Sequence, residues 1–128
     1  KDINADDEDE EEDKKDDGKL KLKSEYYNYI KIGTKRIELR LNDEKRKKIK
    51  INDVIEFIDY ENTNEVLKAK VVDILRYDTF EDIIKEYDIA VLADKDQTKE
   101  NLIKDLNTFY TKEEQVKYGV IGIRIKLL

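Results

Sequence analysis

The sequence predicts an α+β fold in which a small, mixed β-barrel is flanked by helices. Segments with the two-residue periodicity of strands lie mainly between residues 19 and 77 and again at 118–128, and most segments with helical periodicity lie between those two stretches. Helices and strands therefore do not alternate along the chain, as they would in a doubly wound parallel sheet. The length of 128 residues is enough for one such domain.

Acidic residues are concentrated at the N-terminus. Residues 1–17 hold 11 acidic residues and 3 lysines, whereas residues 18–128 hold 21 acidic and 23 basic residues, so the net charge of −6 describes the terminus and not the domain. We expect residues 1–18 to be a disordered acidic arm, because they have few apolar groups to bury, and residues 19–128 to fold. Two interpretations of the arm are open: a competitor of nucleic acid for a basic surface, or a solubilising linker.

The first half of the domain is predicted to be mostly strands. Lys and Leu alternate strictly in residues 19–23, which favours an edge strand guarded by lysines. Ser24 is placed to cap a helix that ends at Gly33. Three further strands are predicted at residues 35–42, 54–60 and 66–77. A charged turn at 43–50 follows the first of these strands, and a loop at 61–65 follows the second.

The second half is predicted to be helical until its last strand. Three helices begin at residues that are typical N-caps: Asp78 or Thr79, Thr98, and Thr111, which starts a capping box. The state of residues 90–92 is left open, and residues 118–128 alternate as a final strand. Ten apolar strand residues are predicted to form the core: Ile37, Leu39, Val54, Ile55, Phe57, Val71, Ile74, Val120, Ile121 and Ile123.

The composition excludes several kinds of chemistry. The chain has no Cys and no His, so disulfides, thiolate metal sites and Ser-His-Asp or Cys-His catalysis are excluded. We predict no metal site and no cofactor. No apolar run approaches the ~18–20 residues of a membrane span, and there is no secretory signal. The expected location is intracellular, in the cytoplasm, and no membrane partner is expected.

The strand at 35–42 carries the most informative pattern. Its apolar residues share one face, while Arg36, Glu38 and Arg40 share the other, with Lys35 at the mouth of the strand. Charged side chains on a rigid strand suit the recognition of an anionic ligand such as a nucleotide. The alternative interpretation is an ordinary solvated strand face.

The same strand resembles the signature of a known family. Gly33-x-Lys35-x-x-Glu38-x-Arg40 is similar to the motif of the ASCH domain, a relative of the PUA domain. Three further segments resemble bacterial and archaeal single-domain ASCH proteins in the same order: 42–53, 77–81 and 109–123. The resemblance covers roughly residues 24–127.

The resemblance implies a PUA-like β-barrel with a cleft that is floored by the motif strand. PUA-like domains typically bind RNA. One ASCH branch resembles an amidohydrolase that removes acetyl from acetylated cytidine with a Lys and a Thr of the motif and a distant Glu. Lys35 matches that lysine, but Glu38 stands at the threonine position. Lys35 and Glu38 are therefore the catalytic candidates, and whether the chain is an enzyme is left open.

Alternatives stay open for each residue of the motif. Lys35 is interpreted as a nucleophile or base, as a phosphate contact, or as a plain surface lysine. Glu38 is interpreted as a contact to a base edge, as an acid or base, or as the partner of Arg40. Arg40 offers a planar fork that suits phosphate or a base.

A basic loop and several tyrosines extend the predicted site. Residues 31–50 hold nine basic and three acidic residues, so Lys45, Arg46 and Lys48 are predicted to contact RNA. Tyr110 and Tyr118 are the candidates for base stacking, and a place at the edge of the core is the alternative. The predicted function is an RNA- or nucleotide-binding module. The alternatives are a hydrolase acting on a modified nucleoside and a protein-interaction module of a larger assembly.

Overall fold

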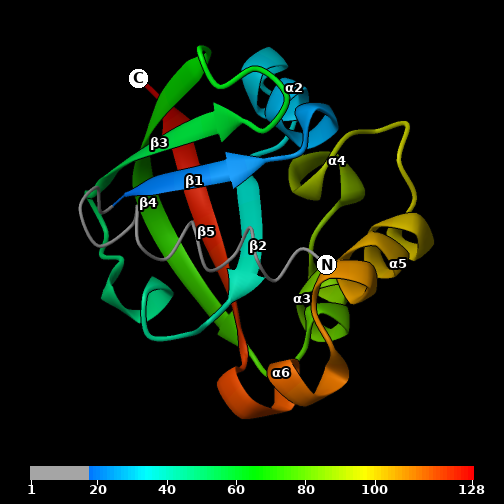
Figure 1. Cartoon of the computed structure of the whole chain (residues 1–128). Coiled ribbons are helices and arrows are strands. Elements are labelled where there is room, and N and C mark those ends of the chain that lie inside the picture. The colour runs from blue at the N-terminus through cyan, green and yellow to red at the C-terminus, as the bar shows by residue number, and fades with distance from the viewer. Residues whose placement is uncertain (1–17) are drawn as a thin grey trace.

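The structure is a computed structural model, and it describes residues 18–128 (Figure 1). The disorder predicted for the acidic arm concerns residues 1–18, of which 1–17 lie outside the described residues. Gly18 is described, and its carbonyl accepts the N–H of Glu56 over 2.7 Å. The described part contains five strands: β1 (Lys19–Leu22), β2 (Ile37–Leu41), β3 (Val54–Asp59), β4 (Val66–Tyr77) and β5 (Val120–Leu127). It also contains a 3-10 helix and five α-helices: η1 (Arg46–Lys48), α2 (Ser24–Ile32), α3 (Phe80–Glu86), α4 (Ile89–Leu92), α5 (Lys99–Phe109) and α6 (Lys112–Tyr118).

The strands form one mixed sheet in the order β1-β3-β4-β5-β2. β1 runs parallel to β3, and the other neighbouring pairs are antiparallel. The sheet curls into a half-barrel with β1 and β2 at its two edges, and α3 to α6 gather on the β2 side (Figure 1). The predicted α+β class is confirmed, as is the edge position of β1, whereas the barrel is only half closed.

The helix starts follow local side-chain chemistry. The hydroxyl oxygens of Thr79, Thr98 and Thr111 each accept a backbone N–H of the first turn, and Thr111 completes the predicted capping box with Glu114. The cap predicted at Ser24 is wrong. Ser24 is already inside the helix, and its hydroxyl donates to the carboxylate of Asp59 instead.

Two apolar clusters stabilise the fold. The inner cluster fills the curled sheet and its cover, α2, and is built from residues such as Phe57, Val71 and Ile123. The helix-side cluster lies between β2 and the helices α3, α4 and α5. Eight of the ten predicted core residues are buried. The burial expected for Ile37, Leu39, Phe57 and Val71 is therefore confirmed.

The two exceptions among the core predictions follow from strand geometry. Val54 is half exposed, because side chains alternate between the two faces of β3 and the next residue, Ile55, is the one that faces the core. Ile74 is only partly buried, although it packs against the inner cluster. A bulge between Val71 and Asp73 shifts the register of β4 there.

Both faces of β2 are covered. Glu38 pairs with Ile123 and Arg40 with Ile121, so these four side chains share one face of the sheet. Since Ile121 and Ile123 belong to the inner cluster, the charged face of β2 points into the half-barrel. The apolar face of β2 packs against the helix-side cluster.

Residues 18–128 contain no helix that is long and apolar enough to cross a membrane.

Candidate functional site

The turn after α2 sets the position of the site. Gly33 adopts the left-handed conformation at φ 94°, and its N–H donates to the carbonyl of Ile30 over 3.0 Å. Three residues further along, the N–H of Arg36 donates to the carbonyl of Val91 in α4 over 2.7 Å. The segment that leads into β2 is thereby fixed between α2 and α4.

Thr34 holds the same turn from a second side. Its N–H donates to the carbonyl of Tyr29 over 3.1 Å. Its hydroxyl lies 3.3 Å from that carbonyl oxygen and 3.2 Å from the carbonyl oxygen of Ala93. These contacts join the end of α2 to the end of α4, directly before the motif lysine.

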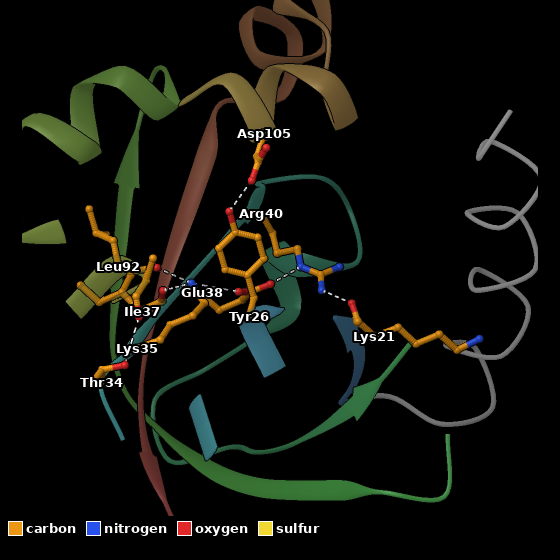
Figure 2. Close-up of polar contacts among 10 residues, drawn as sticks. Lys21, Tyr26, Thr34, Lys35, Ile37, Glu38, Arg40, Leu92 and Asp105 are labelled. Carbon is orange, nitrogen blue, oxygen red and sulfur yellow. Dashed lines mark hydrogen bonds and ion pairs between the residues drawn. The ribbon is translucent and has the colours of Figure 1, made fainter. Parts of the chain in front are cut away.

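Lys35 is buried, with 4% of its surface exposed. Its Nζ donates to the carbonyl oxygens of Ile37 and Leu92, each over 2.7 Å, and lies 3.4 Å from Oε1 of Glu38 (Figure 2). Three acceptors match the three N–H groups of an ammonium. Burial lowers the pKa of Lys35, and the Glu38 carboxylate opposes that shift. The interpretation of Lys35 as a plain surface lysine is wrong.

Glu38 lies between two cations inside the half-barrel. Its Oε1 faces Lys35, and its Oε2 accepts from Nε of Arg40 over 2.7 Å. Burial by itself raises the pKa of Glu38, but the nearby charges of Lys35 and Arg40 outweigh burial, and the net pKa is lowered. Glu38 is therefore an ionised carboxylate at neutral pH. The interpretation of this strand face as solvated is therefore wrong for Glu38, which is buried, whereas Arg36 on the same face is exposed.

Arg40 connects the two edges of the sheet. While Nε is bonded to Glu38 on the same strand, Nη2 donates to the backbone carbonyl of Lys21 in β1 over 2.6 Å (Figure 2). The side chain of Arg40 keeps 13% of its surface exposed. One guanidinium thus joins the two edge strands, and we call the place where Arg40 meets Lys21 the mouth of the half-barrel.

Tyr26 of α2 covers the buried ammonium. The centroid of its ring lies 5.6 Å from Nζ of Lys35, within the range of a cation–π contact. Its hydroxyl donates to Oδ2 of Asp105 in α5 over 2.6 Å. Burial, reinforced by the Asp105 carboxylate, raises the pKa of Tyr26, so the phenol stays protonated. Tyr26 therefore joins α2, α5 and the charged strand.

The other predicted site residues lie outside this charged cluster. Lys45, Arg46 and Lys48 lie in or beside η1, where Arg46 is half-buried and pairs with Asp43 over 3.4 Å. Tyr110 and Tyr118 are half-buried and pack against the helix-side cluster, which fits the alternative of a place at the edge of the core.

Several contributors carry little signal in the sequence. Lys21 and Leu92 act through backbone carbonyls, which any residue supplies. Asp105 faces the site from α5 and looks like an ordinary polar residue of an amphipathic helix. The pairing of Tyr26 with Asp105, 79 residues apart in sequence, depends on the approach of α5 to α2 in the folded chain.

Comparison with known proteins agrees with the motif. A family model described as the ASCH domain matches residues 20–128. The chain belongs to the ASCH domain family. No curated protein matches it.

Two solved structures are similar to this ASCH domain over most of its length. The crystal structure of hypothetical protein PH0355 is 36% identical, with a TM-score of 0.75, and the match covers 86% of this chain and 97% of that one. The solution NMR structure of protein PF0455 from Pyrococcus furiosus is 34% identical, with a TM-score of 0.67, and the match covers 86% of this chain and 96% of that one. The predicted PUA-like fold is confirmed.

The chemistry of the ASCH site follows from how its groups are paired. The three acceptors around Nζ of Lys35 match the ammonium form, and an ammonium has no lone pair to attack a substrate or to take up a proton. Arg40, at the mouth, presents a cation whose direction is fixed by Glu38. This arrangement suits ligand binding better than nucleophilic catalysis, and the hydrolase alternative stays a prediction.

Proposed function

We propose that this ASCH domain binds single-stranded RNA at the mouth of the half-barrel. The observation that carries the proposal is the position of Arg40. Its guanidinium is held between Glu38 and the backbone of Lys21, at the meeting point of the two edge strands. A guanidinium held in this way presents a preorganised fork to a phosphate or a base edge.

Two basic segments adjoin Arg40: one contains β1, whose Lys21 carbonyl Arg40 contacts, and the other follows β2 in the chain. Residues 19–23, which contain β1, hold three lysines and no acidic residue. Residues 45–50, which follow β2 and contain η1, hold five basic residues and no acidic residue. In Figure 1 the loop with η1 leaves the end of β2 and lies below β1. Two segments rich in cations suit a polyanion better than a small neutral ligand.

The proposal gives each charged residue a role. Arg40 contacts a phosphate or a base edge, and Glu38 orients Arg40. Lys35 neutralises Glu38 from behind, so that the site keeps a net positive charge without leaving a carboxylate unpaired. The PUA-like fold adds support by analogy only, because a fold does not determine a function.

Fluorescence anisotropy with a labelled single-stranded RNA at two salt concentrations tests the proposal. We expect binding that weakens as salt rises. Arg40→Lys should bind more weakly than the parent although it keeps the charge, because a lysine cannot contact Glu38, Lys21 and RNA with one planar fork. The matched control is Arg36→Lys, four residues earlier in sequence and exposed.

Three outcomes separate the possibilities. No salt-sensitive RNA binding by the parent would overturn the proposal. Equal affinities for the parent and Arg40→Lys would assign binding to charge alone and remove Arg40 from the site. Thermal melting of each variant distinguishes a lost contact from a lost fold.

A further inference from the structure

Phe109 is an exposed aromatic ring beside the proposed RNA site. It is the last residue of α5, and 44% of its surface is exposed. Nζ of Lys23, which precedes α2, lies 4.7 Å from the centroid of the ring. Phe109 belongs to neither of the two apolar clusters formed by residues 18–128. Its ring lies 6.4 Å from the ring of Tyr110, which packs against the helix-side cluster, so Phe109 contacts the edge of that cluster on one side while 44% of its surface stays exposed.

Helical spacing places this ring next to the covered ammonium. Lys23 directly precedes α2 and Tyr26 lies in the first turn of that helix, while Asp105 and Phe109 are four residues apart on α5. Residues four apart are neighbours on one face of a helix. The Lys23–Phe109 and Tyr26–Asp105 contacts are thus adjacent links between the same two elements. Because the ring of Tyr26 also lies over Lys35, Phe109 is one helical turn from the site.

We propose that Phe109 and Lys23 form a subsite for one unpaired base of the RNA. The inference rests on the proposed function. A base stacks on the open surface of the Phe109 ring, as bases do on aromatic side chains in proteins that bind single strands. The ammonium of Lys23 then contacts the phosphate of that nucleotide, and the chain continues past Tyr26 toward Arg40.

Charge decides between a nucleobase and an apolar protein side chain as the occupant. Phe109 lies under a lysine from segment 19–23, whose charged residues are all lysines, so a ligand on the ring also meets cations. An RNA supplies both an aromatic face and a phosphate within one nucleotide. An apolar side chain of a protein partner, or of a second copy, does not supply an anion together with a planar ring.

The test uses a short single-stranded RNA that carries one 2-aminopurine, a base whose fluorescence is quenched when it stacks. We expect quenching when the full chain binds. Phe109→Leu, which keeps an apolar side chain but removes the ring, should abolish the quenching and weaken binding by roughly 5-fold to 150-fold. The matched control is Tyr60→Leu, which removes another exposed aromatic ring, 51% exposed, just after β3. It should change neither the quenching nor the affinity.

The outcomes separate this inference from the proposed function. If the parent binds the RNA and Phe109→Leu binds it equally well with the same quenching, the subsite is overturned while the proposed function stands. If the parent does not bind RNA, both are overturned. A change of sedimentation coefficient in Phe109→Leu without RNA would assign the ring to contact with a second copy and overturn the subsite.

Discussion

Three side chains with alternating charge define the centre of the molecule. Lys35, Glu38 and Arg40 are each mostly buried, and each charge faces an opposite one within 3.4 Å. Burying charges is costly, and it is tolerated where the charges are paired and their hydrogen bonds are made. Removing one of the three residues should therefore lower the free energy of unfolding, because a remaining buried charge loses a partner.

Removal of the buried ammonium should destabilise the fold strongly. Lys35→Met leaves Glu38 and the carbonyl oxygens of Ile37 and Leu92 without their shared donor. We expect a loss of about 3–5 kcal/mol in the free energy of unfolding, measured by urea denaturation. The double variant Lys35→Met/Glu38→Gln should recover part of the loss, because the buried carboxylate that lost its contact with Lys35 is gone. A loss below about 1 kcal/mol in the single variant would show that the pair is not buried as described.

The stability contributed by Glu38 should depend on pH. Its pKa in the folded state is raised by burial but lowered further by Lys35 and Arg40, so the net value lies below the unfolded value of about 4.3. The contribution is therefore fully present above about pH 4.3 and is lost as the pH falls from there toward the folded-state pKa. Unfolding free energies of the parent and Glu38→Gln should differ by a constant amount near neutral pH and converge on acidification. Curves that stay parallel down to acid would contradict the lowered pKa.

The sequence predicts which of these residues share a strand face, but it does not predict that they are buried. Alternation along 35–42 predicts correctly that Glu38 and Arg40 share a strand face. It does not predict that this face is buried, because burial depends on α2 and β1 closing over it. A lysine at the start of a strand likewise looks exposed until the carbonyl of Leu92 is brought to it from 57 residues away.

At the scale of elements, β5 holds the site strand in place. Gly122 lies opposite Leu39 of β2, where a Cβ would come within 2.5 Å of Cδ1 of Ile83 and 3.2 Å of Cγ2 of Ile37. A side chain at this position would therefore require the Ile83 side chain to change conformation or α3 to shift. The glycine leaves the space that Ile83 of α3 occupies against β5 and β2.

Gly122→Ala should destabilise the protein by about 1–3 kcal/mol through overpacking. Since Ile83→Val removes the Cδ1 atom that the new methyl group meets, the double variant should lose less stability than the two single losses added together. Thermal and urea unfolding measure all three. Parent-like stability of Gly122→Ala would show that α3 yields without cost.

The basic loop at residues 45–50 should strengthen RNA binding through its positive charge, while the specific contacts are made at Arg40. Lys45→Gln/Lys47→Gln/Lys48→Gln should weaken RNA binding and flatten its dependence on salt, with each lost phosphate contact removing about 0.7 from the slope of log affinity against log salt. Arg46 is retained because its side chain is mostly buried and pairs with Asp43, whereas Lys47, which pairs with Glu44, is exposed. The matched control neutralises three exposed lysines of β4 and β5: Lys68, Lys70 and Lys126. Equal effects of the two triple variants would remove the loop from the interface.

Element boundaries follow from local chemistry more directly than tertiary contacts do. The threonine caps of α3, α5 and α6 are visible in the sequence because each uses a backbone N–H three residues away. Ser24 is also a residue type that caps helices, yet it contacts Asp59, which is distant in sequence. Capping residues thus mislead where a tertiary partner competes for the hydroxyl.

At the scale of the whole molecule, the half-barrel has two edges, and one guanidinium bridges them. β1 and β2 lie at opposite ends of the strand order, and Arg40 joins them through the carbonyl of Lys21. The proposed RNA site therefore lies where the sheet is open. The fold class was predictable from strand and helix patterns, whereas the half-open barrel was not, because no local pattern encodes which edges meet.

Backbone amide NMR of the full chain, titrated with single-stranded RNA, tests the central claim most directly. We predict that chemical shifts change at residues 19–26, 35–40 and 105–110, which surround Arg40, Tyr26 and Phe109. Amides of residues 66–72, in β4, should stay unchanged and serve as the internal control. Changes confined to β4, or no changes at RNA concentrations that saturate binding in anisotropy, would contradict the proposal that the mouth of the half-barrel is the RNA site.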